Sequence, residues 1–200
     1  IHAGGEDLVF PHHENEIAQS EAANGKMFSK YWMHNAFLNI DGRKMSKSLG
    51  NFKTVRGISE MYDLQILRFF MLSAHYRSPL NFSADLMDAA KNGLERIITA
   101  VDNLKFLNDN CKGGDELRAD ETDVIREIDA FVKRFDDAMD DDFNTADAIS
   151  VVFELVRYAN SNISADNSRA CIGKAFDTIL MLSDILGLIV NKEDEMIDAD

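Results

Sequence analysis

The chain has 200 residues and a formal net charge of -14, and it is 46% hydrophobic and 28% charged, as is typical of a globular protein of one or two domains. No apolar run is long enough to cross a bilayer and no signal-peptide pattern opens the sequence, so we expect neither a membrane protein nor a secreted one. The two cysteines, Cys111 and Cys171, exclude a disulfide framework and fit a reduced, cytoplasmic setting.

The charge is divided unevenly along the chain. Residues 1–100 contain 11 basic and 11 acidic side chains, whereas residues 101–200 contain 10 and 24. Proteins that hold nucleic-acid phosphates usually present a basic face, so the second half is a poor candidate for a phosphate-binding surface. The first half is neutral overall and contains one local basic loop, which we expect to contact an anionic ligand.

The first 60 residues alternate short apolar runs with turn residues. The stretch "AFLNI" (36–40) predicts a strand that ends at the turn Asp41-Gly42. The stretch "PHHENEIAQSEAA" predicts a helix from Pro11 to about Ala23, closed by Asn24-Gly25.

From about residue 54 the pattern is helical. Asp63 is predicted to divide the following segment into two short helices, and Pro79 to end it. Ser83 is the predicted N-cap of a long amphipathic helix. Its apolar stripe is expected to comprise Leu86, Ala90, Leu94, Ile97, Val101 and Leu104.

Three further amphipathic helices are predicted after a polar loop at 111–120. Their apolar positions are Val124, Ile128, Phe131 and Phe135 in the first, Ile149, Val152, Phe153 and Val156 in the second, and Ala175, Ile179, Leu182 and Leu186 in the third. Asn144 is the predicted cap of the second of these helices, and the last one is expected to end near Gly187. Four such helices joined by short loops predict an antiparallel bundle.

The basic loop lies in "IDGRKMSKSLGN" (40–51). Lys44 and Lys47 are positive charges on flexible stems, Ser46 and Ser48 can donate hydrogen bonds, and the flanking glycines let the backbone bend. Such a loop suits a polyanion whose charge grows during a reaction, as when pyrophosphate leaves ATP. An arbitrary Lys/Ser cluster would be a solvated turn, but the pentamer "KMSKS" arises by chance with a probability on the order of 10⁻⁴. The pentamer resembles the second signature of class I aminoacyl-tRNA synthetases, and this resemblance favours a loop that binds phosphates over a solvated turn.

Two further stretches carry candidate ligands. In "FPHHENEIAQSE", His12 and Glu16 are four residues apart, so a helix places them on one face, where an imidazole and a carboxylate can bind one metal ion. A hydrogen bond on a helix surface is the default reading of such a pair. In "HAGGEDL", the glycines Gly4 and Gly5 permit a ligand to approach the backbone, and Asp7 can accept hydrogen bonds from a ribose; a tight turn explains these residues almost as well.

These segments resemble the cysteinyl-tRNA synthetase family, whose members are class I aminoacyl-tRNA synthetases. The stretches "HAGGEDLVFPHHENEIAQSEAA", "YWMHNAFLNIDGRKMSKSLGN", "LRFFMLSAHYRSPLNFS" and "MDDDFNTADAI" occur here in the order in which they occur in that family. The resemblance covers nearly the whole chain and is strongest over residues 1–83.

The resemblance implies a zinc ion that recognises the thiolate of the substrate cysteine, with His12 and Glu16 as ligands. A soft sulfur ligand distinguishes cysteine from serine far better than an apolar pocket does. The two cysteine ligands of the family match no position here, and Cys111 and Cys171 fall in the helical half and are not expected to replace them. With two of four protein ligands, we expect the chain alone to hold zinc poorly or not at all.

The resemblance also implies an ATP site, used with Mg²⁺. Gly5 and Asp7 match the segment that holds the adenosine ribose, and His2 matches a histidine beside the substrate pocket. The signature residues Lys44, Met45, Ser46, Lys47 and Ser48 match the ATP-contacting loop, with Lys44 and Lys47 as the catalytic cations. The HIGH signature of the family is missing, so we expect the chain alone to be inactive. Ala3 stands where the family usually has glycine.

The fold implied by the resemblance is mostly α: a remnant of a Rossmann-like α/β catalytic domain followed by an antiparallel helical bundle. Residues 1–60 would be the end of the catalytic domain, 61–82 a connecting helical segment, 83–190 the four-helix bundle and 191–200 an acidic tail; the C-terminal anticodon-reading module of the family is expected to be absent. The expected partners are tRNA(Cys), cysteine and ATP, with a monomeric enzyme. Two alternatives remain open: a cysteine ligase of the mycothiol pathway, and a non-catalytic helical interaction module.

Overall fold

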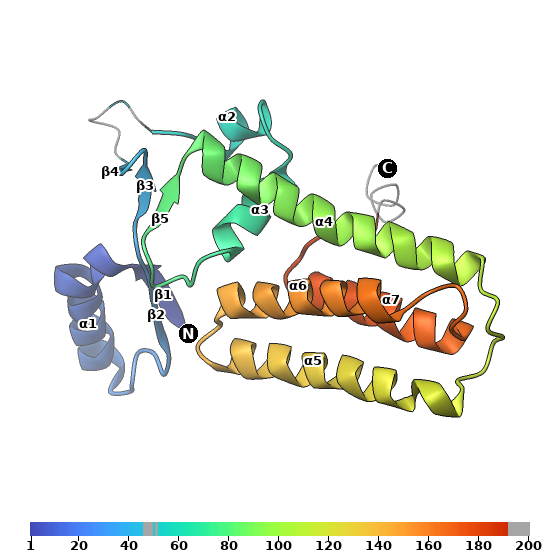
Figure 1. Cartoon of the computed structure of the whole chain (residues 1–200). Helices are drawn as coiled ribbons and strands as arrows, with labels where there is room; N and C mark the ends of the chain where they lie inside the picture. Colours follow the sequence, from blue (N-terminus) through green and yellow to red (C-terminus); the bar gives the residue numbers. More distant parts are fainter. Residues whose placement is uncertain (46–49, 51, 192–200) are drawn as a thin grey trace, which may run out of the picture.

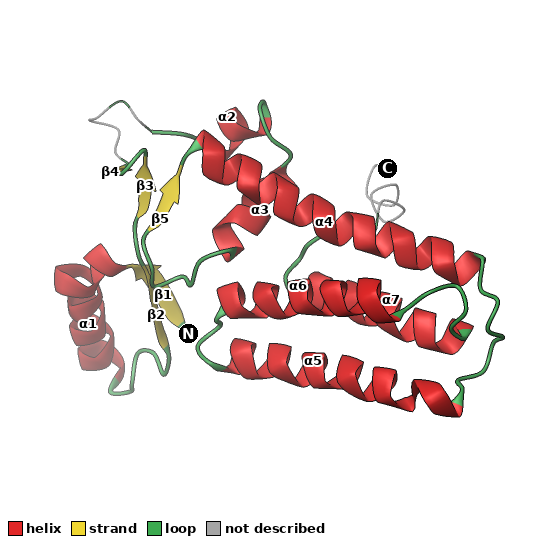
Figure 2. Cartoon of the chain, viewed as in Figure 1, coloured by secondary structure: helices red, strands yellow, loops and turns green. Residues whose placement is uncertain are grey.

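The computed structural model describes residues 1–45, 50 and 52–191. Short strands and one helix form the part of the molecule that contains the N-terminus, and long helices form the rest (Figure 1). Helix is the prevailing secondary structure of the described chain (Figure 2). The predicted class, a Rossmann-like α/β remnant followed by a helical bundle, is confirmed.

The first sheet consists of two parallel strands, β1 (His2–Gly5) and β2 (Trp32–Asn35). Parallel strands require a crossover connection, and here it contains a 3-10 turn η1 (Glu6–Leu8), an irregular turn η2 (Val9–His13) and helix α1 (Glu14–Asn24). Gly25 closes α1 with a φ of 61°, as the Asn24-Gly25 pair predicts. At its other end, regular helix begins at Glu14, three residues after the predicted start at Pro11. The peptide bond between Phe10 and Pro11 is cis.

The second sheet has the strand order β4–β3–β5. Strand β3 (Leu38–Ile40) pairs antiparallel with β4 (Arg43–Lys44) and parallel with β5 (Leu80–Phe82). The hairpin turn is Asp41-Gly42, as predicted, and both turn residues have positive φ, 47° and 75°. This conformation favours Asp followed by Gly in a two-residue hairpin.

Two short helices, α2 (Val55–Ser59) and α3 (Leu64–Leu72), lie in the chain between β4 and β5. The predicted break at Asp63 is confirmed, and its side chain caps α3 by accepting a hydrogen bond from the Gln65 amide at 2.7 Å. The segment 61–82 is not wholly helical, however, because its last residues form β5 and pair with β3. Strand β5 therefore lies within the segment that was expected to be helical, although it belongs to the sheet of β3.

The long helices are α4 (Ala84–Asp109), α5 (Thr122–Asp140), α6 (Thr145–Asn162) and α7 (Arg169–Ile185), and a 3-10 turn η3 (Ala119–Glu121) precedes α5. They lie roughly antiparallel to their chain neighbours (Figure 1). Ser83 and Asn144 cap α4 and α6 as predicted, through the amides of Leu86 and Asp147.

The core runs through the helical half and reaches the second sheet and α3. Its fully buried large side chains include Met87, Ile97, Leu104, Ile128, Phe135, Leu155, Ile172, Ile179 and Leu182. The predicted stripe of α4 is correct from Ala90 onward but wrong at its first position, because Leu86 is 44% exposed and Met87 takes the inward place. Among the described residues, no helix combines the length and the apolar character that crossing a membrane requires.

Candidate functional site

Four aromatic and histidine side chains gather on one face of the first sheet. The parallel register pairs His2 with Trp32 and Gly4 with His34. Residues two apart on a strand share a face, so His2 and Gly4 on β1 lie beside Trp32 and His34 on β2. His13, the last residue of η2, closes the group from the crossover connection.

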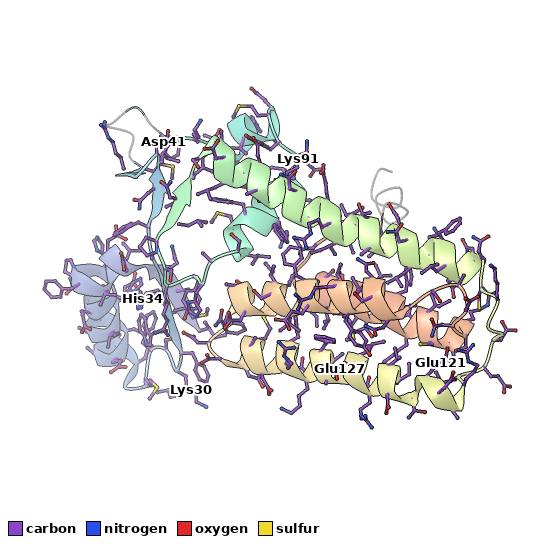
Figure 3. The ribbon with its side chains drawn as sticks, viewed as in Figure 1. Lys30, His34, Asp41, Lys91, Glu121 and Glu127 are labelled. Carbon is purple, nitrogen blue, oxygen red and sulfur yellow. The ribbon has the colours of Figure 1, made fainter. Side chains whose placement is uncertain are left out.

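Short contacts hold this histidine cluster, which we define as His2, His13, His34 and Glu16. His2 Nε2 lies 2.7 Å from Glu16 Oε2, and His13 Nδ1 lies 2.8 Å from His34 Nε2. The ring centroids of His2 and His13 are 4.8 Å apart and nearly perpendicular, and the Trp32 ring lies 4.9 Å from His2 and 5.4 Å from His13. His34 lies at the strand end of the molecule (Figure 3).

Gly4 makes room for the His13 ring. A Cβ atom on Gly4 would lie 3.0 Å from His13 Cε1 and 3.1 Å from His13 Nε2, closer than most such contacts. The glycine pair was expected to permit the approach of a ligand; the structure shows that Gly4 permits the approach of a histidine.

The cluster offers a set of metal ligands. One ligand atom from each of His2, His13 and Glu16 lies within 4.8 Å of the others. Two imidazole nitrogens and one carboxylate oxygen are a donor set that zinc accepts, with a fourth position left for a substrate atom. His13 is buried at 4% exposure, whereas Glu16 is 47% exposed, so one side of the group faces solvent.

His12 is exposed and is not a member of this group. The structure therefore brings Glu16 together with His2, predicted as a residue of the substrate pocket, and with His13, which the sequence analysis missed. His13 and Glu16 are three residues apart, a spacing that also places side chains on one helix face, so the signal was present in the sequence. Metal binding by His12 and Glu16 stays a prediction.

The candidate nucleotide residues lie at the carboxyl end of β1. Gly5 is the last residue of that strand, and Asp7 follows in η1 with its side chain exposed. In open parallel sheets, ligands bind beyond the carboxyl ends of the strands, so the placement of Gly5 and Asp7 suits the predicted role.

The signature loop continues from the β3–β4 hairpin. The backbone of Lys44 belongs to β4, and Met45 packs partly buried against the core, with its amide bonded to the Leu38 carbonyl at 3.3 Å. Ser46, Lys47 and Ser48 lie outside the described residues. The predicted contacts of these residues with ATP therefore stay predictions.

Comparison with known proteins agrees with this reading of the fold. Residues 1–92 match the family model of the class I (C) tRNA synthetase catalytic domain, and residues 134–191 match that of the DALR domain. A solved ternary complex of Agrobacterium radiobacter K84 agnB2 LeuRS with tRNA and LeuAMS shares the fold, with a TM-score of 0.74 at 17% identity over 99% of this chain and 26% of the other. The two matched segments are thus similar to the domains of class I tRNA synthetases.

Within that class, the similar curated proteins are cysteine--tRNA ligases. The enzyme of Lachnospira eligens is 67% identical over the whole of this chain and 42% of its own length. Those of Lachnoclostridium phytofermentans and Clostridioides difficile are 54% and 53% identical, each over 43% of its own length. The chain is a homologue of the cysteine--tRNA ligases, as the sequence motifs predict, and it spans less than half the length of these relatives.

Proposed function

We propose that the chain is part of a cysteine--tRNA ligase, which couples cysteine to tRNA(Cys) at the expense of ATP. The observation that carries the proposal is the group of His2, His13 and Glu16 beside the first sheet, because its nitrogen and oxygen donors suit a zinc ion that binds a thiol. The similarity of the whole chain to the Lachnospira eligens enzyme supports the same conclusion.

The proposed reaction has two steps. In the first, a carboxylate oxygen of cysteine attacks the α-phosphorus of ATP, which gives cysteinyl-adenylate and releases pyrophosphate. In the second, a ribose hydroxyl of the terminal adenosine of tRNA attacks the acyl carbon, and AMP leaves. Lys44 and Lys47 would neutralise the phosphates in the first step, assisted by Met45, Ser46 and Ser48 of the signature and by Mg²⁺. Gly5 and Asp7 would hold the ribose of ATP.

Zinc, when bound, would supply a soft Lewis acid for the substrate thiolate. Glu16 would be a ligand in either of two arrangements, with His12 as the resemblance implies or with His2 and His13 as their proximity suggests. In the second arrangement, the 2.8 Å contact with His34 would orient the His13 ring. We further propose that the enzyme acts as a monomer in the cytoplasm and that the chain alone does not complete the site.

A chimera tests the proposal. Residues 1–200 replace the matching segment of the Lachnospira eligens enzyme, and cysteine-dependent exchange of pyrophosphate into ATP is measured. The chimera should be active, and Lys47→Ala should lower the exchange rate about a hundredfold or more while leaving cysteine binding nearly unchanged. An inactive chimera that folds and retains the relative's other segments would exclude the proposal; equal losses in rate and cysteine binding would contradict the role of Lys47.

The same chimera tests whether His12 or His13 is the zinc ligand. Zinc content is measured after His12→Ala and His13→Ala, and cysteine binding is compared with serine binding. Loss of zinc only in His13→Ala would support the geometric group, and loss only in His12→Ala the resemblance. An active chimera that transfers cysteine to an amino sugar and not to tRNA would favour the mycothiol-pathway alternative, whereas a chain that acts only as a helical interaction module would give no exchange.

A further inference from the structure

The turn that begins the signature hairpin is bonded to a side chain from a distant part of the chain. Asn81 Oδ1 accepts a hydrogen bond from the Gly42 amide, with 2.7 Å between nitrogen and oxygen. Asn81 is the middle residue of β5, and it follows Gly42 by 39 residues. The neighbouring turn residue is bonded to the same strand, since the Asp41 amide donates to the Phe82 carbonyl at 3.1 Å.

The Gly42 amide needs an acceptor that the hairpin does not provide. The β3–β4 ladder pairs Ile40 with Arg43 and Asn39 with Lys44, so the two turn residues stand outside it. Gly42 is exposed, so without a protein partner its amide would donate to water instead. Strand β5, which lies parallel to β3, brings the Asn81 side chain to the turn, and this contact supplies the missing acceptor.

The choice of asparagine is informative at this position. Asparagine is disfavoured in strands, and its neighbours Leu80 and Phe82 are apolar and turned toward the core. Local preference therefore does not explain Asn81, whereas the bond to Gly42 does. Two residues later, Ser83 caps α4, the 26-residue first helix of the bundle. Asn81 thus joins the hairpin turn to the start of the helical half.

We propose that Asn81 is a positioning residue for the signature: it fixes the turn at Gly42 and, through it, the backbone of Arg43, Lys44 and Met45. The proposal rests on the proposed function, in which these residues lead into the ATP-contacting loop. Asn81 lies outside the signature, and through it the turn of the β3–β4 hairpin is anchored to β5.

An isotope-labelling experiment on the 200-residue chain isolates this bond. Gly42 is the only glycine that follows an aspartate, so labelling aspartate carbonyls with ¹³C and glycine nitrogens with ¹⁵N gives one selected amide signal. Exchange of the Gly42 amide proton with solvent should be about three- to tenfold faster in Asn81→Ala than in the parent. Asn81→Asp keeps an oxygen acceptor at the same place and should restore the parental rate.

Gly57 provides the matched control. It is the only glycine that follows an arginine, so a second sample with ¹³C-labelled arginine carbonyls selects its amide, which is also held by a side chain, Thr54 Oγ1, at 3.0 Å. Its exchange should be unchanged in every variant. Gly42 exchange in Asn81→Ala within about twofold of the parent, with Gly57 unchanged, would overturn the proposal. If Asn81→Ala does not fold, Asn81→Ser takes its place, and an unprotected Gly42 amide in the parent would overturn the proposal equally.

The chimera adds a functional readout. Asn81→Ala should lower the maximal rate of pyrophosphate exchange about tenfold or more while the KM for cysteine stays the same, and Asn81→Asp should recover the rate. Faster Gly42 exchange with an unaltered reaction rate would refute the positioning role. An unsubstituted chimera without activity would count against the proposed function, whereas the Gly42 amide would still decide whether Asn81 holds the turn.

Discussion

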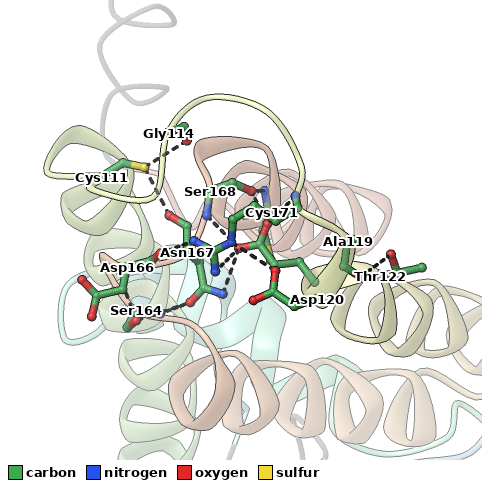
Figure 4. A network of polar contacts seen from close by, with 12 residues as sticks. Cys111, Gly114, Ala119, Asp120, Thr122, Ser164, Asp166, Asn167, Ser168 and Cys171 are labelled. Atoms are coloured by element: carbon green, nitrogen blue, oxygen red, sulfur yellow. Dashed lines mark hydrogen bonds and ion pairs between the residues drawn. The ribbon is translucent and has the colours of Figure 1, made fainter.

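Glu121 is a charged side chain buried at the end of the helical half opposite the strands, with 1% of its surface exposed (Figure 3). Its carboxylate accepts hydrogen bonds from the Ser168 amide at 2.7 Å, the Asn167 side chain at 3.1 Å and the Arg118 amide at 3.0 Å, and also from the Ser168 hydroxyl. These bonds tie the loop before α5 to the loop before α7, where Cys111 also donates to the Asn167 carbonyl (Figure 4).

The pKa of Glu121 makes folding stability depend on pH. Burial raises the pKa of this carboxyl, but the bonds from Ser168, Arg118 and Asn167 outweigh burial and lower the pKa from 4.5 to about 2. Because the pKa is lower in the folded state, the stabilisation is complete above about pH 4.5 and is lost as the pH falls toward 2. The full contribution is about 3 kcal/mol.

Glu121→Gln should therefore lower the free energy of unfolding at pH 7 by about 2–4 kcal/mol, since the partners of a buried charge are left poorly matched. The variant should also show a shallower loss of stability between pH 4.5 and 2, as measured by urea denaturation across that range. Glu116→Gln, which changes an exposed glutamate of the preceding loop, is the control. Parallel pH profiles for Glu121→Gln and the parent would contradict the assigned role.

The placement of individual candidate residues was predictable where one motif carries them. Gly5, Asp7 and Glu16 follow from local spacing, and the structure places them at a strand end or in the histidine cluster. His34 was not predictable, because it meets His13 only through the parallel register of β1 and β2, and a register between distant strands leaves no periodic signal in either.

At the scale of elements, helix α3 packs against α4 at Gly93, a residue without a side chain. A Cβ atom on Gly93 of α4 would lie 2.9 Å from the Cε1 atom of the buried Phe69 ring, whereas a Cβ atom on Gly173 of α7 would meet nothing within 4 Å. Both glycines lie inside helices, where alanine is intrinsically better by about 0.8–1 kcal/mol.

The two Gly→Ala substitutions should therefore have opposite effects. Gly173→Ala should raise the free energy of unfolding by about 0.5–1 kcal/mol, and Gly93→Ala should lower it by about 1–3 kcal/mol because the ring must move. Chemical denaturation measures the free energy of unfolding of each variant. Because both substitutions are Gly→Ala inside a helix, the gain in helix propensity is the same, and the difference reports the contact with Phe69. Equal stabilisation by both would show that Phe69 does not require the gap.

The helices were more predictable than the strands for a physical reason. The predicted caps Ser83 and Asn144, the predicted break at Asp63 and a period of 3.6 residues are local features, and both caps and the break are confirmed. Strand β5 has only three residues and forms by pairing with β3, whose partner residues lie 42 positions earlier in the chain, so nothing in "LNF" alone marks it. The error at Leu86 has a different origin: Met87, one residue later, fits the same helical period, so the period alone does not decide between them.

At the scale of the whole molecule, the α5–α6 turn joins the helical half to the strands. Asp142 and Phe143 both have positive φ, 55° and 56°, which is unfavourable for side chains with a Cβ. This turn directs Asp142 toward the chain before β5: Tyr76 Oη donates to Asp142 Oδ1 at 2.8 Å, and Arg77 Nε lies 2.7 Å from Asp142 Oδ2. The Tyr76 carbonyl in turn accepts from the Ala36 amide, next to β2.

A double-mutant cycle measures this connection. Asp142→Asn retains a residue that tolerates positive φ while removing the charge, and Tyr76→Phe removes the hydroxyl. Each substitution should cost about 0.5–1 kcal/mol, with a coupling of similar size between them, because the contact is partly exposed. Asp141→Asn, at the exposed neighbouring position, should show no coupling to Tyr76→Phe. Strict additivity of Asp142→Asn and Tyr76→Phe would rule out the connection.

Strand β5 has a consequence for how the chain can be divided. It lies between two helices in the sequence, yet it completes the sheet begun by β3. A single scission between residues 53 and 79 would leave one piece with β3 lacking its parallel neighbour and the other with an unpaired three-residue strand at the head of α4. Such pieces would reassociate edge to edge, so a split chain would behave as a complementing pair rather than as two independent modules.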